Sequence, residues 1–255
     1  MNIHEFGKDN EKIIVLLHPL GVWWDVFSET IDLLENEYHL IVPAIPGHDP
    51  NDQRSEFSSI EDIVSELTNY LVINSYDHVT CLYGCSMGGA LVIRILAEGR
   101  IHSDFAVIDG GITPYQLPKL FTYLIGIRDY CMAQMGKHLS LKMLKSVFDP
   151  NKYSNEDLKY IKKVLSSMSN ATIWNSFYST NNYSMPMQIR KTDSLIQYWY
   201  GEKEKKARKW DITYVKKVFP ETEFIEFPDL DHAEYFTLHP EEFCDRLKKL
   251  IEERR

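Results

Sequence analysis

Two glycines flank a serine at a spacing that suits a catalytic nucleophile. Ser86 has Gly84 two residues before it and Gly88 two residues after it. A serine hydroxyl is a weak nucleophile until a base takes its proton, and a strained turn around it needs neighbours without bulky side chains. Apolar residues precede and follow the turn, so the segment predicts a strand, a sharp turn and a helix. At the N-terminus of that helix, unpaired N–H groups would favour developing negative charge.

A nucleophilic serine needs a neutral imidazole within hydrogen-bond reach. Of the nine histidines, His232 lies just after the last predicted strand, in a loop that precedes the final helix. His18 and His48 also follow predicted strands and remain rivals. We predict that His232 is the base.

The imidazole in turn needs a carboxylate that fixes its tautomer and stabilises its charged form. Glu204 lies three residues past Gly201 in the turn after the penultimate predicted strand, and it is the preferred candidate. Glu202 in the same turn and Asp109 at the end of an earlier strand stay open as alternatives. The surrounding lysines also allow the two glutamates to be part of a solvated charge cluster.

The elements that must position these residues alternate between strands and amphipathic helices. This alternation predicts an α/β fold with a mostly parallel central sheet flanked by helices. The predicted strands are 13–17, 39–42, 78–83, 105–108, 194–200 and 223–227, with a possible leading strand at 2–6. The predicted helices of this core are 24–35, 60–71, 87–98, 212–219 and 239–251. Ligands of such sheets bind beyond the carboxyl ends of the strands, which is where the candidate residues lie.

The alternation stops after Gly111 and resumes near residue 194. Between them the periodicity predicts helices at 141–148, 157–168 and 171–178, with no strand. We therefore predict a core formed by residues 1–111 and 194–255, with a helical lid at 112–193 inserted after the strand that ends near Asp109.

These residues together resemble the α/β-hydrolase superfamily, and in particular its lid-bearing small-molecule serine hydrolases. The motifs that carry the resemblance are His18-Pro19-Leu20-Gly21, Pro46-Gly47-His48, Gly84-Cys85-Ser86-Met87-Gly88-Gly89, the Gly201 turn and Asp229-Leu230-Asp231-His232. In that superfamily the Gly-x-Ser-x-Gly turn is the nucleophile elbow. The resemblance implies that the N–H groups of Met87 and Leu20 form an oxyanion hole and that Ser86 is acylated and then freed by water.

Aromatic residues are frequent in the predicted lid and directly after the His18-Pro19-Leu20-Gly21 turn. An apolar lid over a polar triad would favour a small hydrophobic or aromatic acyl substrate. The candidate pocket residues are His18, Trp23, Tyr115, Trp174 and Phe177. The aromatic residues can equally form the lid's own core and its contact with the sheet.

Composition limits the possible partners. The formal net charge of −9 argues against nucleic acid, because phosphate binding requires a basic surface. No run of apolar residues is long enough for a membrane span, and the first residues are too polar for a signal peptide, so we expect a cytoplasmic protein. The four cysteines show no metal-ligand spacing and are expected to be reduced thiols. We expect neither a metal nor an organic cofactor, while the oligomeric state stays open.

The sequence thus predicts an enzyme that cleaves a carboxylester or thioester bond in a small hydrophobic substrate. The alternative is a small-molecule receptor on the same scaffold with little turnover.

Overall fold

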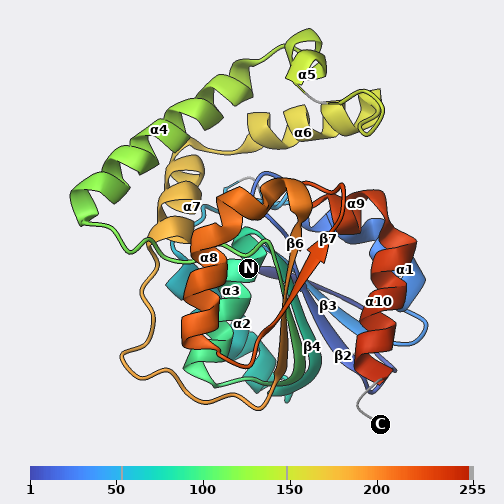
Figure 1. Cartoon of the computed structure of the whole chain (residues 1–255). Helices are drawn as coiled ribbons and strands as arrows, with labels where there is room; N and C mark the ends of the chain where they lie inside the picture. The colour runs from blue at the N-terminus through green and yellow to red at the C-terminus, as the bar shows by residue number, and fades with distance from the viewer. Residues whose placement is uncertain (53, 148, 253–255) are drawn as a thin grey trace.

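The centre of the protein is a seven-stranded sheet, seen in a computed structural model that describes residues 1–52, 54–147 and 149–252 (Figure 1). Its strands are β1 (Asn2–Phe6), β2 (Ile13–Leu17), β3 (His39–Ala44), β4 (His78–Cys85), β5 (His102–Asp109), β6 (Leu195–Gly201) and β7 (Glu223–Phe227). Their order across the sheet is β1-β3-β2-β4-β5-β6-β7. Only β1 runs antiparallel, against β3, and the other pairs are parallel. This arrangement confirms the predicted α/β architecture and the leading strand.

Helices cover both faces of the sheet, and each face has its own apolar core. One face packs against α2 (Ile60–Ile73), α3 (Met87–Glu98) and α8 (Lys205–Val218). The other packs against α1 (Ser28–Leu34), α9 (Glu234–Leu238) and α10 (Pro240–Glu252). The central strands are buried from both sides, which explains why Ile13–Leu17 is continuously apolar rather than alternating.

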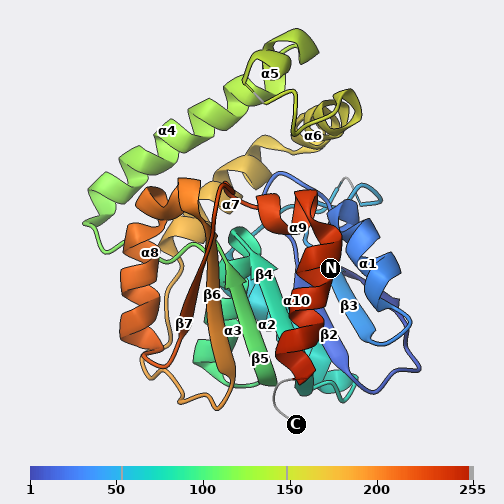
Figure 2. The same cartoon turned by 45° about the vertical axis from the view of Figure 1, so that its right-hand side comes forward.

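In the described residues between β5 and β6 there are four further helices, which we call the helical insertion. They are α4 (Lys119–His138), α5 (Leu141–Val147), α6 (Asn155–Ser167) and α7 (Asn170–Asn182). Both ribbon views place the insertion beyond the carboxyl ends of the strands (Figures 1 and 2). Three of its helices match the predicted ones within a few residues, and the predicted end of one of them, residue 148, lies outside the described residues.

The longest helix of the insertion, α4, was not predicted. Its buried positions include Thr122 and Gly126, whereas Leu120 and Leu124 are more than half exposed. The helix therefore lacks an inward apolar stripe, which is the signal that sequence periodicity detects.

The helix α8 begins at Lys205 instead of at the predicted residue 212. Its first turns are polar and mostly exposed, so they carry no apolar period. The predicted helix over 24–35 is divided into a 3₁₀ turn at Trp24–Phe27 and α1.

All four cysteines are free thiols, as expected. No helix among the described residues has the length and apolar character to cross a membrane.

Candidate active site

Ser86 occupies a strained turn between β4 and α3. Its backbone has φ 55° and ψ −110°, in a region that residues with a side chain rarely adopt. A Cβ at Gly84 would lie 2.2 Å from the carbonyl oxygen of Gly88, and a Cβ at Gly88 would lie 2.0 Å from that of Leu17. The two flanking glycines are therefore required because backbone passes where a side chain would be. Ser86 is 7% exposed.

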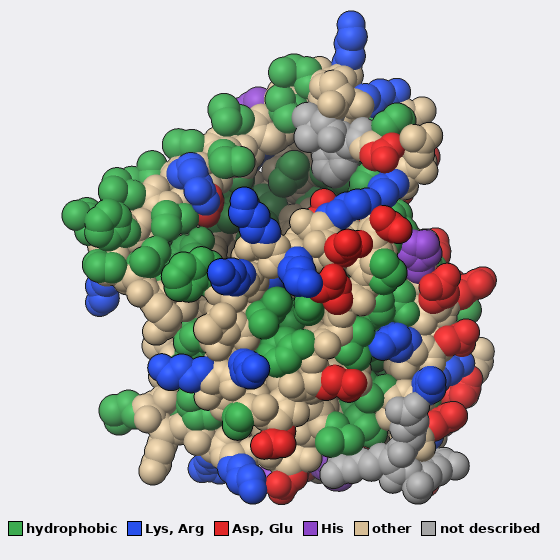
Figure 3. All heavy atoms as spheres, viewed as in Figure 1, with side chains coloured by type: hydrophobic (Ala, Val, Ile, Leu, Met, Phe, Trp, Pro, Cys, Tyr) green, Lys and Arg blue, Asp and Glu red, His purple; other side chains and the backbone are tan. Residues whose placement is uncertain are grey.

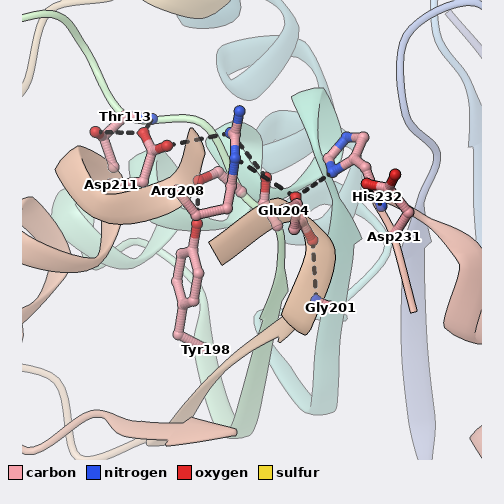
Figure 4. A network of polar contacts seen from close by, with 10 residues as sticks. Thr113, Tyr198, Gly201, Glu204, Arg208, Asp211, Asp231 and His232 are labelled. Carbon is pink, nitrogen blue, oxygen red and sulfur yellow. Dashed lines mark hydrogen bonds and ion pairs between the residues drawn. The ribbon is translucent and has the colours of Figure 1, made fainter. Parts of the chain in front are cut away.

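An imidazole and a carboxylate meet at the same edge of the sheet. Nδ1 of His232 lies 2.6 Å from Oε2 of Glu204, and Oε1 of Glu204 accepts a hydrogen bond of 3.2 Å from the N–H of Gly201 (Figure 4). Glu204 is buried, whereas the His232 side chain is 37% exposed. Because a carboxylate only accepts, Nδ1 of His232 donates this hydrogen bond, and in the neutral imidazole Nε2 then carries the lone pair.

The backbone at residues 109–110 lies between the serine and the histidine. The N–H of Ser86 donates to the carbonyl of Asp109 at 2.8 Å. A Cβ at Gly110 would lie 2.8 Å from Nδ1 of His232, so the missing side chain gives the ring its space. Within the described part of the chain, no hydrogen bond engages the Ser86 hydroxyl or Nε2 of His232. Among these residues, the Ser86 hydroxyl and Nε2 of His232 are therefore not hydrogen-bonded to each other either.

The two alternative carboxylates point elsewhere. Asp109 is buried and accepts a 2.6 Å hydrogen bond from the Tyr83 hydroxyl. Its pKa is raised to about 7, chiefly by burial; the Tyr83 hydrogen bond acts against this shift, and the nearby Glu204 adds to it. Glu202 is exposed and accepts a hydrogen bond from the N–H of Asp229 at 3.1 Å. Of the three candidates, Glu204 is the one in contact with the imidazole.

The rival histidines are packed into the protein and already have backbone partners. His18 and His48 are both fully buried. Nδ1 of His18 donates to the carbonyl of Pro19, and its Nε2 accepts from the N–H of Ile45 at 3.4 Å. Burial lowers the pKa of His18 to about 4 and that of His48 to about 3. Such weak bases are poorly suited to remove a serine proton near neutral pH.

The two predicted oxyanion donors belong to adjoining segments. Met87 is the first residue of α3, so its N–H has no acceptor within the helix. Leu20 belongs to the loop after β2, and the close approach of Gly88 to Leu17 holds the start of α3 against the end of that strand. The start of α3 and the segment that follows β2 therefore adjoin, and an oxyanion hole formed by these two N–H groups belongs to the proposed mechanism.

The predicted pocket residues separate into two groups. Trp23 and Trp174 make contacts that join elements: the Trp23 ring packs edge-on against Tyr160 of α6, and Trp174 stacks on Tyr178 and contacts Tyr123 of α4. Phe177 lies on α7, three residues after Trp174, and is partly buried. His18 is in the core, as described above.

Tyr115 has a different environment, because it lines a cavity of about 240 Å³ between the start of the insertion and α8. Arg208 and Asp211 line the same cavity. Burial raises the pKa of the Tyr115 hydroxyl.

Sequence reasoning missed Arg208 and Asp211, which extend the polar network behind the carboxylate. Nε of Arg208 lies 3.5 Å from Oε2 of Glu204, and Nη1 lies 3.1 Å from Oδ2 of Asp211 (Figure 4). Asp211 also accepts from the N–H and hydroxyl of Thr113, both at 2.8 Å. Their spacing of four and seven residues after Glu204 would have placed all three on one helical face, had the helix start been recognised.

No group of three or more His, Cys, Asp or Glu side chains within the described residues could hold a metal ion.

Known proteins share this architecture over the full chain. A model of the Alpha/beta hydrolase family matches residues 14–246. An alpha/beta hydrolase family protein from Desulfitobacterium hafniense has a TM-score of 0.77 at 19% identity, covering 98% of this chain and 100% of that one. MenH from S. aureus has a TM-score of 0.74 at 16% identity, covering 99% and 97%. The esterase EaEST from Exiguobacterium antarcticum has a TM-score of 0.73 at 15% identity, covering 98% and 94%.

At these identities the solved structures show a shared fold, whereas the family model spans most of the sequence. The protein therefore belongs to the alpha/beta hydrolase family.

Proposed function

We propose that the protein is a serine hydrolase that cleaves a carboxylester or thioester bond in a small hydrophobic substrate. The observation that carries the proposal is the 2.6 Å contact between Nδ1 of His232 and Glu204, at the same sheet edge as the strained Ser86 turn. The family match supports hydrolytic chemistry, and esterases are among the proteins of the same fold.

In the proposed reaction Nε2 of His232 takes the proton of the Ser86 hydroxyl as its oxygen attacks the acyl carbon. Glu204 fixes the tautomer and stabilises the imidazolium. The N–H groups of Met87 and Leu20 bind the oxygen that becomes negative. His232 then returns the proton to the departing alcohol or thiol, leaving an acyl-serine. Water, deprotonated by the same imidazole, releases the acid and restores Ser86.

The helical insertion would act as a lid over this site, with residues 112–193 as a cap on the core of 1–111 and 194–255. Its position beyond the strand ends supports the proposal, because a substrate at Ser86 would lie beneath it. Tyr115 is the proposed pocket residue with the best support, since it lines a cavity next to the network of Glu204. His18, Trp23, Trp174 and Phe177 are then part of the frame around the pocket.

The test is turnover of short-chain p-nitrophenyl esters and thioesters by the purified protein. We expect hydrolysis, labelling by a fluorophosphonate probe, and loss of both in Ser86→Ala, with kcat falling by about 10³-fold or more. Ser55→Ala is a suitable control, because that hydroxyl lies in a partly buried loop and bonds only to backbone. Absence of turnover together with absence of labelling would refute the hydrolase and favour the receptor alternative.

A further inference from the structure

The helix α4 exposes most of its large apolar side chains, whereas a helix that covers a core buries them. The residues that it buries, Thr122 and Gly126, are small, and Tyr130 one turn after Gly126 packs edge-on against Trp174 of α7. Most of its large apolar side chains lie on the opposite side and are exposed. With Leu117, two residues before the helix, they form what we call the outer face of α4: Leu117, Leu120, Phe121, Leu124, Ile127, Met132 and Met135.

The exposure of this outer face is large. Leu120 is 67% exposed, Phe121 57% and Met135 63%. Figure 3 shows hydrophobic side chains gathered along the edge of the molecule formed by α4. Part of the face is hollowed into a shallow apolar groove between Leu117, Phe121 and Leu124, with Arg128 at its border. Contiguous apolar surface of this kind marks an interaction site rather than a solvated helix.

The charge around the outer face is opposite to that of the protein. Residues 112–148 contain five basic residues and a single acidic one, although the chain as a whole carries −9. The acidic residue, Asp129, is paired with Arg128 at 2.6 Å. The basic residues are Lys119, Arg128, Lys142 and Lys145, together with Lys137, whose ammonium donates to the carbonyl of Met168 and does not face outward. A surface that complements this face is therefore apolar and negatively charged.

A second copy of the chain fits these charges poorly. In a symmetric dimer the same patch appears on both partners, so two basic, apolar faces would meet without acidic groups to pair the lysines. An anionic lipid surface supplies both parts of the complement: acyl chains for the leucines, phenylalanine and methionines, and phosphate groups for the lysines. A helix that lies in the interface needs an apolar face and flanking basic residues, which α4 has.

We propose that the outer face of α4 docks the protein onto an anionic lipid surface. The helix lies along the surface, with Leu120, Phe121 and Leu124 entering the acyl region and Lys119 and the lysines of α5 facing phosphate groups. This docking does not depend on hydrolysis, because none of these residues belongs to the proposed triad.

Co-sedimentation of the full chain with vesicles tests the proposal. We expect binding to vesicles of equal parts phosphatidylglycerol and phosphatidylcholine, weaker binding to phosphatidylcholine alone, and loss of binding as salt is raised. Leu120→Glu combined with Leu124→Glu should lower the partition coefficient by about tenfold or more, because two glutamates oppose both burial and the negative surface. Lys142→Glu with Lys145→Glu should lower it for the anionic vesicles only.

Ile73→Glu is the matched control, because Ile73 is 81% exposed at the end of α2, which precedes the amino end of β4, and should leave binding unchanged. Circular dichroism of each variant verifies that it is folded. Failure to bind anionic vesicles would overturn the proposal, as would equal binding to neutral ones. A dimer in sedimentation equilibrium without lipid, broken by Leu120→Glu and Leu124→Glu, would assign the face to a second copy instead.

Discussion

At the scale of single residues, the choice among carboxylates is decided by reach and burial. Glu204 is buried, receives the Gly201 N–H and contacts the imidazole at 2.6 Å. Glu202 is two residues away in sequence but faces Asp229 and solvent. A pair of glutamates that look equivalent in sequence therefore differ completely in their environment.

This difference predicts the effect of removing each charge. Glu204→Gln should lower kcat by about 10²- to 10⁴-fold, because the imidazolium loses its counter-charge and the ring can adopt the wrong tautomer. Glu202→Gln is the matched control and should remain near wild type. Steady-state kinetics on an activated ester measures both. If Glu204→Gln retained full activity, the assigned acid would be wrong.

The raised pKa of Asp109 predicts how the stability of the protein changes with pH. Its pKa is raised by burial from 3.8 to about 7, so the folded protein holds the proton more tightly than the unfolded chain. The protonated carboxyl of Asp109 therefore contributes its full share to the free energy of unfolding below about pH 4. This contribution is lost as the pH rises to about 7. Asp109→Asn keeps an acceptor for the Tyr83 hydroxyl and cannot ionise.

We therefore expect Asp109→Asn to raise the urea midpoint more at about pH 8 than at about pH 5, where the raised pKa of Asp109 still keeps the wild-type carboxyl mostly protonated. Esterase activity of the variant should stay near wild type if Glu204 is the acid. A change in midpoint that is the same at both values of pH would contradict the raised pKa of Asp109.

At the scale of elements, the helical insertion is attached to the core by polar contacts at separate points. The hydroxyl of Tyr160 on α6 accepts from the N–H of Trp23 at 3.0 Å and donates to Asp25 at 2.7 Å. The hydroxyl of Ser179 on α7 accepts from the N–H of Ile60 at 2.8 Å. These contacts fix which side of α6 and α7 faces the sheet, and they leave the outer side of α4 uncovered.

A further attachment joins the insertion to the loop of the proposed base. Lys152, between α5 and α6, lies 2.6 Å from Oε2 of Glu234, and the same carboxylate accepts from the N–H of Asp231 at 2.8 Å. Glu234 is buried. The ion pair therefore links the position of the insertion to the segment that carries His232.

A double-mutant cycle measures this link. Lys152→Met and Glu234→Gln should each lower the free energy of unfolding. The double variant should lose less of it than the two single variants combined, because each single change leaves the other member of the pair without its partner. The exposed pair Lys159–Glu156 on α6 is the control and should show little coupling. Urea unfolding gives all of these free energies. Simple additivity for Lys152 and Glu234 would show that the contact does not join the two parts.

At the scale of the whole molecule, stability below neutral pH depends on histidines that the fold keeps neutral. Burial lowers the pKa of His18 to about 4 and that of His48 to about 3. In the unfolded chain both imidazoles take up protons below the ordinary histidine pKa of 6.5. Because the unfolded state binds more protons, stability falls as the pH drops from about 6.5 toward 4. Asp109 gives a slope of opposite sign, so single variants are needed to separate the two.

His48→Asn should flatten the fall in stability between about pH 6.5 and 4, because an amide can still donate to the carbonyl of Pro46 but does not titrate. His78→Asn is the control, since the side chain of His78 is 66% exposed and lies 3.3 Å from the carboxylate of Asp104, which is itself partly exposed. Urea midpoints across this range measure both slopes. An unchanged slope in His48→Asn would mean that the imidazole of His48 takes up its proton in the folded state as well.

The sequence by itself determined the α/β architecture, the strand-turn-helix at Ser86 and the chain order of the candidate triad. These features follow from local patterns: apolar runs for buried strands, glycines at the close approaches of the elbow, and a loop histidine after the last strand. Tertiary structure alone decided which carboxylate meets His232, because reach across a turn depends on side-chain direction and not on spacing. It also decided that α4 exists and exposes its apolar face, since a helix with small residues inward gives no inward stripe for periodicity to detect.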